Sequence, residues 1–557
     1  MHPQFDDAGQ DAKLAQLRVE EEEDLARILS EKYGLPYTDL SIVPINMDAL
    51  RVVPENDARG TKAIAFDKNG KHLSLAIVSP ENDALPELLE HLRSEGYQVE
   101  QFLISDLGFQ SAILRYRDLS IVTENRDGIF DVTGPDLAKL TKRLATPSGL
   151  RTFLEETLQT KHASSVSTVF EGVLVSAFSQ KASDIHIEPG EEEYRLRFRL
   201  DGVLTDMYYF DEHTYRLITS RIKILSGLKL NIVDRAQDGR FSVAIAGEEV
   251  EMRTSIIPGN FGESIVLRIL DESSIEHPFE EMGLHPKLLE RLRKEIHRPN
   301  GMLLTTGPTG SGKTTTLYSF MREIHTPEIK IVTIEDPVEY HVPGIVQTQT
   351  NGKEYTFASG LRSVLRQDPD VIMVGEIRDA EVAEVAVQAA LTGHFVFSTL
   401  HTNNAAGAFP RLVDLGVDPK TFSSAISVVM GQRLVRTLSE EGKVERPTTD
   451  EEKEIMKKIF EDLTDTSLLP ASFDTVWDAN PSVTSESGYK GRTGLHEAIF
   501  MDDELGEFLR DNPSSSDILK ATRRQGYLTM AQDGILKAIA GVTSLQEVFK
   551  VVDLPRG

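Results

Sequence analysis

The stretch GPTGSGKTTT, from Gly307 to Thr316, follows the short apolar run Met302–Leu304 and precedes a segment of helical composition. Its glycines allow backbone N–H groups to point inward at phosphate oxygens. Lys313 would place a cation at the β- and γ-phosphates, and the Thr314 hydroxyl would ligate magnesium. The flanking strand and helix favour a phosphate-binding loop (P-loop) over a glycine-rich turn that only caps a helix. The predicted nucleotide-binding residues of this loop are Gly307, Pro308, Thr309, Gly310, Ser311, Gly312, Lys313, Thr314 and Thr315.

The composition indicates a multidomain chain without thiol chemistry. Its 557 residues exceed what one hydrophobic core accommodates and suggest roughly three to four domains. The absence of cysteine excludes disulfides, thiolate metal sites and thiol nucleophiles. We find neither a membrane-spanning apolar run nor a secretory signal, so we expect a cytoplasmic protein that reaches a membrane only through a partner. The formal net charge of −28 argues against a large nucleic-acid-binding surface.

Hydrophobic periodicity and turn signals divide the chain into segments. Near the N-terminus, the run Glu20–Glu23 predicts a solvated arm, and Leu25, Ile28 and Leu29 then share one face of a helix that ends near Gly34. The predicted segments are an acidic disordered arm (1–23), a small α/β domain (24–116), a linker (117–155), a domain of strands and helices (156–275), and an α/β domain with C-terminal helices (280–557).

Two kinds of strand pattern follow one another along the chain. The segment Tyr194–Leu200 alternates apolar residues with Arg195, Arg197 and Arg199, which predicts a strand with one apolar face and one face of guanidiniums. Later strands are short apolar runs between helical segments, which is typical of a mainly parallel α/β sheet. These runs are Met302–Leu304, Ile329–Ile334, Val371–Val374 and Phe395–Leu400.

Acidic residues follow two of the predicted buried strands. Glu376 follows Val371–Val374 as in a Walker B strand, where it would order magnesium or the attacking water. Glu335 and Glu339 lie after another apolar run, at the edge where open α/β sheets bind ligands, and either carboxylate could polarise water. An Asp-Pro turn without a chemical role is the alternative there. His401 could sense the γ-phosphate, and its alternative is a structural role at a strand end.

Several long motifs occur in the order typical of the type II secretion and type IV pilus assembly ATPases. They are ASDIHIEP (Ala182–Pro189), GPTGSGKTTT, TIEDPVEY (Thr333–Tyr340), LRQDPDVIMVGEIRD (Leu365–Asp379) and LTGHFVFSTLHTNNA (Leu391–Ala405). The chain therefore resembles a GspE/PilB-type secretion traffic ATPase over about residues 165 to 550. The resemblance implies an α/β fold class: a RecA-like P-loop ATPase domain preceded by a PAS-like α+β domain and a small N-terminal α/β domain.

The resemblance also implies a function and a set of site residues. It implies a homo-hexamer that hydrolyses ATP with Mg²⁺ to drive pilus assembly or secretion, with ATP between the RecA-like and PAS-like domains. Arginines of the PAS-like domain would reach the phosphates, although any one of them could instead belong to a wet sheet face. The matching arginines are Arg197, Arg199, Arg240, Arg253 and Arg268. The predicted catalytic residues are Lys313, Glu335, Glu339, Glu376, His401, Arg253 and Arg268, with Thr314 and Glu376 at the magnesium ion.

The sequence departs from this family at two places. Many relatives hold zinc with two Cys-x-x-Cys pairs, but the insert at about 437–492 has Ser439, Gly442, Pro481 and Thr484 there, so no zinc is expected. That subdomain must then be held by packing alone or be more mobile. The segment LARILSEKYGLPYTDL resembles an N-terminal domain that docks on an inner-membrane platform protein or, in some relatives, binds cyclic di-GMP. The Arg-Leu-Gly start of the dinucleotide-binding versions is missing, which favours docking.

Three alternatives to an assembly or secretion motor remain. Retraction ATPases of the same superfamily are the runner-up, but they usually lack an N-terminal domain of this size. A RecA-fold nucleic-acid motor would need a basic stripe with aromatic residues, which the acidic composition disfavours. A regulator that binds ATP without hydrolysing it is disfavoured by the joint presence of Lys313, Glu335 and Glu376.

Overall fold

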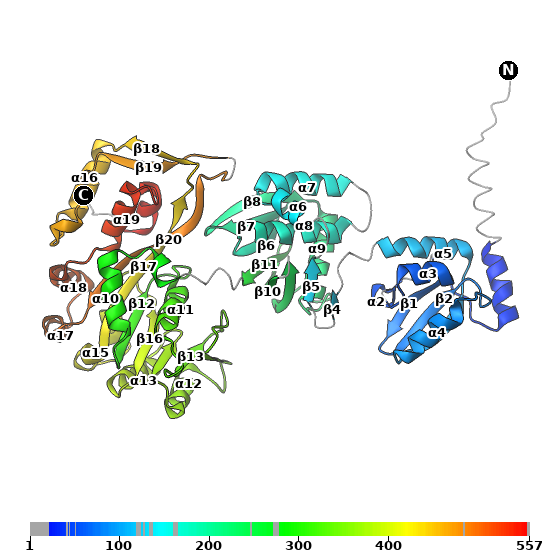
Figure 1. The fold of residues 1–557 in the computed structure, drawn as a ribbon, viewed down its shortest axis with the longest axis horizontal. Helices are drawn as coiled ribbons and strands as arrows, with labels where there is room; N and C mark the ends of the chain where they lie inside the picture. Colours follow the sequence, from blue (N-terminus) through cyan, green and yellow to red (C-terminus); the bar gives the residue numbers. More distant parts are fainter. Residues whose placement is uncertain are drawn as a thin grey trace, which may run out of the picture. The chain divides into compact units, whose positions relative to one another are not determined.

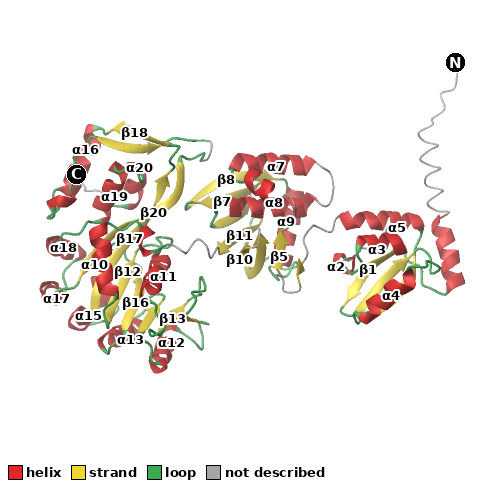
Figure 2. Ribbon diagram, viewed as in Figure 1, coloured by secondary structure: helices red, strands yellow, loops and turns green. Residues whose placement is uncertain are grey.

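A computed structural model gives the fold of most of the chain (Figures 1 and 2). It describes residues 22–40, 43, 45–50, 52–117, 124–125, 129–132, 137–159, 165–245, 248–270, 278–482 and 485–553. Residues 1–21, which make up most of the expected acidic arm, lie outside the described residues. In the described part of the chain, none of the helices has the length and apolarity that crossing a lipid bilayer requires.

The N-terminal domain is built on a three-stranded sheet in the order β1-β2-β3. Strand β2 pairs antiparallel with β1 and parallel with β3, as the apolar alternation within residues 73–78 predicts for a strand. One core fills the space between this sheet and its helices, with Leu75 and Leu92 buried. The elements are α2 (Met47–Leu50), α3 (Glu55–Thr61), β1 (Ala63–Asn69), β2 (His72–Ile77), α4 (Leu85–Ser94), β3 (Gln98–Leu103) and α5 (Asp106–Ile113).

The helix at the start of this domain spans 22–33 and differs from the prediction in two respects. Leu25 and Ile28, which share one face, are 56% and 65% exposed, so this face does not enter the core. Glu23, expected in a disordered arm, lies in the helix and accepts hydrogen bonds from Tyr37 and, at 2.6 Å, from Ser105 Oγ. Glu23 is thus tied to the domain that was expected to begin at Asp24.

The next domain contains an eight-stranded sheet in the order β4-β5-β9-β10-β11-β6-β7-β8. The linker predicted over 117–155 does not fit the described part of that segment, which contains β4, β5, α6 and the start of α7. The elements are β4 (Glu124–Asn125), β5 (Ile129–Val132), α6 (Leu137–Arg143), α7 (Pro147–Gln159), α8 (Ser165–Ser179), β6 (Asp184–Pro189), β7 (Tyr194–Leu200), β8 (Val203–Phe210), α9 (Glu212–Leu225), β9 (Gln237–Ile245), β10 (Glu248–Gly259) and β11 (Gly262–Leu270).

The domain that the resemblance predicts to be the ATPase domain is built on a seven-stranded sheet in the order β14-β13-β15-β16-β12-β17-β20. All neighbours pair in parallel except the last, because β20 runs antiparallel to β17. The four predicted buried strands are therefore confirmed as β12, β13, β15 and β16. The strands are β12 (Gly301–Thr306), β13 (Ile331–Glu335), β14 (Val346–Gln349), β15 (Val371–Val374), β16 (Phe395–Leu400), β17 (Ile426–Leu438) and β20 (Tyr489–Phe500).

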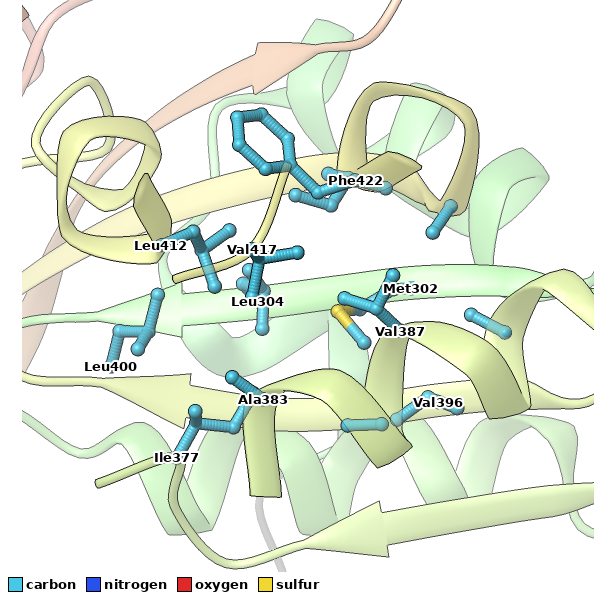
Figure 3. Packing of buried hydrophobic residues seen from close by; sticks show 14 of the residues in the cluster. Met302, Leu304, Ile377, Ala383, Val387, Val396, Leu400, Leu412, Val417 and Phe422 are labelled. Carbon is cyan, nitrogen blue, oxygen red and sulfur yellow. The ribbon is translucent and has the colours of Figure 1, made fainter. Parts of the chain in front are cut away.

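Helices cover both faces of this sheet, and β12, β13, β15 and β16 are buried along their whole length. Leu303 of β12 belongs to a core with α10 (Pro286–Ile296) and α11 (Lys313–Ile324). Its neighbours Met302 and Leu304 point to the opposite face, where the helices α12 to α15 pack (Figure 3). The helices on that face are α12 (Phe357–Val364), α13 (Ala380–Leu391), α14 (Ala408–Asp414) and α15 (Pro419–Ala425).

The insert between β17 and β20 forms a small subdomain with its own core, together with the C-terminal helices α19 and α20. Ser439 Oγ accepts a hydrogen bond from Gly442 N at 3.1 Å, and Thr484 lies outside the described residues. Within the described ranges, no group of three or more His, Cys, Asp or Glu residues could hold a metal ion. The elements of the subdomain are β18 (Lys443–Pro447), α16 (Asp450–Phe460), β19 (Thr475–Ala479), α19 (Met530–Ile539) and α20 (Leu545–Val551). The helices α17 (Asp503–Leu509) and α18 (Ser515–Thr522) pack instead on the core of the main sheet.

A buried ion pair ties α20 to β17 at the base of this insert. Arg436 donates hydrogen bonds of 3.0 and 2.7 Å to the two carboxylate oxygens of Glu547 and stacks 4.0 Å from the ring centre of Tyr489. Both side chains are mostly buried, with 14% and 8% exposed. Burial acts to raise the pKa of Glu547, but the hydrogen bonds and charges of Arg436 and Lys550 outweigh it and lower the pKa from 4.5 to about 2.

We expect Glu547→Gln to destabilise the subdomain by roughly 3–5 kcal/mol near neutral pH, because Arg436 then loses its buried counter-charge. A carboxylate whose pKa is lowered by folding stabilises the folded state above its unfolded pKa and loses this effect as pH falls. The difference from the unaltered chain should therefore shrink as pH falls from 4.5 toward 2. Thermal unfolding at several pH values across this range measures the difference in stability between the two proteins. Glu440→Gln is the control, because that carboxylate is 85% exposed, and a difference independent of pH would contradict the argument.

Candidate active site

The candidate site lies at the edge where the parallel strands of the ATPase domain end. The P-loop follows β12, Glu335 ends β13, Glu376 follows β15, and His401 follows β16. Because these four strands are neighbours and run in the same direction, their carboxyl ends meet at one edge. An open pocket of about 420 Å³ at this edge is lined by residues from all four segments.

The P-loop wraps closely around its own lysine. Gly312 has a φ of +86°, and a Cβ there would lie 2.9 Å from Gln432 Nε2, so both conformation and space require glycine. Lys313 Nζ donates to the carbonyl oxygens of Gly307 at 2.8 Å and Pro308 at 3.1 Å. Burial lowers the pKa of Lys313, while the charge of Glu376 acts to raise it. Of the predicted loop residues, those that line the pocket are Thr309, Gly310, Gly312, Lys313, Thr314 and Thr315; Gly307, Pro308 and Ser311 lie behind them.

Glu376 is the centre of a chain of charges at the pocket wall. Its side chain is 16% exposed, is paired with Arg378, and lies 3.2 Å from His401 Nε2. Arg378 also reaches to 3.8 Å from Asp336. The structure thus brings the predicted residues Glu376 and His401 together beside Lys313.

Glu335 belongs to the wall of the pocket but is itself buried, with 2% of its surface exposed. It accepts hydrogen bonds from the Tyr318 hydroxyl, from Thr333 Oγ1 at 2.5 Å and from Gln347 Nε2 at 3.2 Å. Three donors from α11, β13 and β14 thus converge on one carboxylate. This arrangement is typical of a buried structural group whose hydrogen-bonding capacity is used within the protein.

Glu339 lies four residues further along, on the accessible side of the pocket, and its side chain is exposed. Partial desolvation raises the pKa of its carboxyl, and the charge of Glu335 acts in the same direction. The positive charges of Arg268, Arg253 and Lys313 oppose this rise. Glu339 is thus a carboxyl with a perturbed pKa beside cations, which is a common property of reacting groups.

The five arginines predicted at the site have different surroundings. Arg197 pairs with Glu188 at 3.3 Å and Asp206 at 3.1 Å, and Arg199 pairs with Asp184 at 3.3 Å. These two arginines lie on the polar face of β7. This position corresponds to the alternative that they belong to a wet sheet face and do not reach the phosphates. Arg240 is exposed on β9.

The remaining two arginines, on β10 and β11, are the ones that the structure brings toward the acidic segment TIEDPVEY (Thr333–Tyr340). Arg253 donates a 2.7 Å hydrogen bond to the Val338 carbonyl, one residue from Glu339. Arg268 lies near enough to lower the pKa of Glu339, although it also pairs with Asp184 at 3.1 Å.

Sequence reasoning missed several residues that line the pocket. Asp336 follows Glu335 in the motif TIEDPVEY, and Arg378 lies two residues after Glu376 in the motif LRQDPDVIMVGEIRD. Their positions in these motifs could have identified both as pocket residues. Leu434 and Arg492 come from β17 and β20, far from the P-loop in sequence, and only the pairing of these strands places them there.

We expect Tyr318→Phe to lower the free energy of unfolding of the ATPase domain by about 1–3 kcal/mol, because Glu335 loses a buried donor. Urea unfolding followed by fluorescence measures the change. Tyr209→Phe is the matched control, since this tyrosine is 47% exposed and bonds only to a surface carboxylate, Asp206. If the two variants were equally stable, the Tyr318–Glu335 hydrogen bond would not support the domain.

Comparison with known proteins identifies the family. The family model described as "Type II/IV secretion system protein" matches residues 159–550, and the MshEN domain matches residues 33–122. The type II secretion system protein E of Dickeya dadantii is 37% identical over 92% of this chain and 99% of its own length. The type IV pilus assembly ATPase PilB of Myxococcus xanthus is 34% identical over 95% of this chain and 91% of its own length.

A solved structure agrees with the fold. The Yersinia pseudotuberculosis ATPase DotB superposes with a TM-score of 0.50 at 20% identity, over 69% of this chain and 93% of its own. This similarity concerns the fold alone, whereas the sequence matches above establish descent. The chain therefore belongs to the type II/IV secretion system protein family of ATPases.

Proposed function

We propose that the chain is the cytoplasmic motor of a type IV pilus assembly or type II secretion machine. It hydrolyses ATP in the pocket at the sheet edge, assembles as a homo-hexamer and acts on an inner-membrane platform protein. The observation that carries the proposal is the convergence of Lys313, Glu376 and Glu339 on one pocket. Pilus assembly and secretion are kept together because relatives named for each align over more than nine-tenths of the chain.

The donor set of the pocket fits a magnesium ion bound with the nucleotide. The Thr314 hydroxyl and the Glu376 carboxylate are hard oxygen ligands that line the same pocket as Lys313. When bound, the ion neutralises charge on the phosphate oxygens. The backbone N–H groups of the P-loop and the Lys313 ammonium hold the phosphates in place, and His401 reports on the γ-phosphate through its contact with Glu376.

Glu339, rather than Glu335, orients the attacking water. A group that accepts a proton from water needs free lone pairs and access to the reacting phosphorus. Glu335 is buried in the pocket wall, and three protein donors already occupy most of the lone-pair sites of its carboxylate. Glu339 lines the open pocket, and its raised pKa makes it a better base than an ordinary glutamate.

Arg253 and Arg268 neutralise charge that develops on the phosphates during hydrolysis. Both side chains carry a permanent positive charge, and these charges act to lower the pKa of Glu339. They belong to β10 and β11, outside the RecA-like domain that carries the P-loop. Hydrolysis then requires the two domains to approach each other, and release of the products lets them separate, which couples chemistry to movement.

Glutamine substitutions test the assignment of the carboxylates. We expect Glu339→Gln to lower kcat by about 10²- to 10⁴-fold with little change in unfolding temperature, because only the base is lost. Glu335→Gln should instead lower the unfolding temperature, since its amide N–H₂ would face the donor groups around it. Steady-state ATPase assays and thermal unfolding measure both effects. Glu384→Gln, on the exposed side of α13, is the control.

Two outcomes would contradict this assignment. A Glu335→Gln variant of normal stability that no longer hydrolyses ATP would make Glu335 the base. A Glu376→Gln variant with normal turnover would refute the proposed ATPase site itself, because Glu376 is the carboxylate placed beside Thr314 and Lys313.

Alanine substitutions test the two arginines. We expect Arg253→Ala and Arg268→Ala each to lower kcat by about 10²-fold, because each removes a cation that stabilises the transition state. Arg195→Ala is the control, since this arginine pairs with Glu188 at 3.2 Å on the face of β7. Sedimentation velocity checks that the assembly state is unchanged. Normal turnover in both variants would show that these arginines do not reach the phosphates.

A further inference from the structure

The pocket has a second wall on the side of the P-loop that faces away from the carboxylates. In the sheet, β15 and β13 lie on one side of β12, and β17 and β20 lie on the other. Pairing of β17 with β12 ends at Thr306↔Gly431, but β17 continues to Leu438. This extended part pairs with the start of β20, including Arg436↔Arg492. The hairpin therefore projects beyond the sheet edge, beside the P-loop.

Contacts fix this wall against the loop. Gln432 Oε1 accepts a 2.8 Å hydrogen bond from Thr316 Oγ1, in the first turn of α11. A Cβ on Gly312 would lie 3.5 Å from Leu434 Cδ1, which shows how closely the loop and β17 approach each other. Leu434 and Arg492 are the residues through which this hairpin lines the pocket.

Arg492 is a cation in this wall whose charge has no partner among the residues that the structure describes. Its side chain is exposed, and across the parts of the chain that the structure describes no hydrogen bond or ion pair holds its guanidinium. Its neighbours on the hairpin are used within the protein: Arg436 binds Glu547, and Arg433 donates a 2.6 Å hydrogen bond to the Asn403 carbonyl. Of these three hairpin arginines, Arg492 is the one that lines the pocket in the part of the chain that the structure describes.

The positions of the groups around the pocket indicate which part of the nucleotide would face the wall formed by β17 and β20. Lys313 and the carboxylates mark the end of the β- and γ-phosphates. The opposite wall then faces the α-phosphate and the nucleoside. An arginine suits that end, because a planar guanidinium binds phosphate oxygens through paired hydrogen bonds and also stacks on aromatic rings. Leu434 supplies apolar contact beside it.

We propose that Arg492, with Leu434, binds the nucleoside monophosphate part of the nucleotide, which ATP and ADP have in common. This assignment rests on the proposed function, since it places a residue in the same ATP pocket. The bound part does not change during cleavage of the γ-phosphate. Arg492 therefore contributes equally to the ground state and the transition state, and its loss weakens binding without slowing the chemical step.

The test uses the full chain with Arg492→Ala and Arg492→Lys, and with Lys490→Ala as the control. Lys490 is exposed on the same strand and does not line the pocket. Fluorescent mant-ATP and mant-ADP titrations give Kd, and steady-state assays give KM and kcat. We expect Arg492→Ala to raise Kd for both nucleotides and KM by about tenfold, with kcat within about twofold. Arg492→Lys should lose less nucleotide affinity, because the positive charge remains. This lysine variant replaces the alanine variant in the test if the alanine variant fails to fold.

Four results would overturn or redirect the inference. Unchanged Kd for both nucleotides in Arg492→Ala would overturn it. A loss confined to ATP, with a lower kcat, would also overturn it, because Arg492 would then act at the γ-phosphate. An equal loss in Lys490→Ala would assign the effect to the strand as a whole and refute the specific role. If the unaltered chain itself bound neither nucleotide, the proposed function would fail first.

Discussion

The parallel pairing of β12 with β16, and of β16 with β15, brings the P-loop, Glu376 and His401 to one edge of the sheet. The register joins Met302 to Val396 and Ile372 to Val396, so three strands from separate parts of the chain end together. Their residues are buried on both faces, with helices packed against each (Figure 1). A shift of one residue would exchange the faces of every side chain, which makes the register difficult to change. The P-loop and Glu376 meet because of this constraint.

Glu335 and Glu339 show how the same edge gives two nearby carboxylates different roles. Glu335 is the last residue of β13, so its side chain remains in the protein interior and has to find donors there. Tyr318 belongs to the helix that follows the P-loop, so this hydrogen bond also fixes α11 against β13. Glu339 lies beyond the strand, where the chain leaves the sheet and enters the pocket. A buried carboxylate thus supports the scaffold, and a partly desolvated one lines the open part of the pocket.

Much of the ATPase domain could be predicted from sequence because its signals are local. The four buried strands and the P-loop depend on short apolar runs and on glycine spacing, which neighbouring residues determine. The arginine face of β7 was also visible, but its partners were not, because Glu188 and Asp206 come from β6 and β8. The exposure of Leu25 and Ile28 could not be predicted either. Periodicity shows that residues share a face and leaves open whether anything covers that face.

Leu434 and Arg492, which sequence reasoning missed, line the pocket because of strand pairing, and the same pairing connects the insert to the pocket. Arg492 reaches the pocket only because β20 pairs with the projecting part of β17, after the insert of about 50 residues that separates the two strands. The same part of the hairpin is held by the Arg436–Glu547 ion pair and by the ring of Tyr489. In the ladder Arg436 lies directly opposite Arg492, so the ion pair that secures the insert also sets the position of the free guanidinium. Packing of the C-terminal subdomain is therefore part of the architecture of the pocket at the sheet edge.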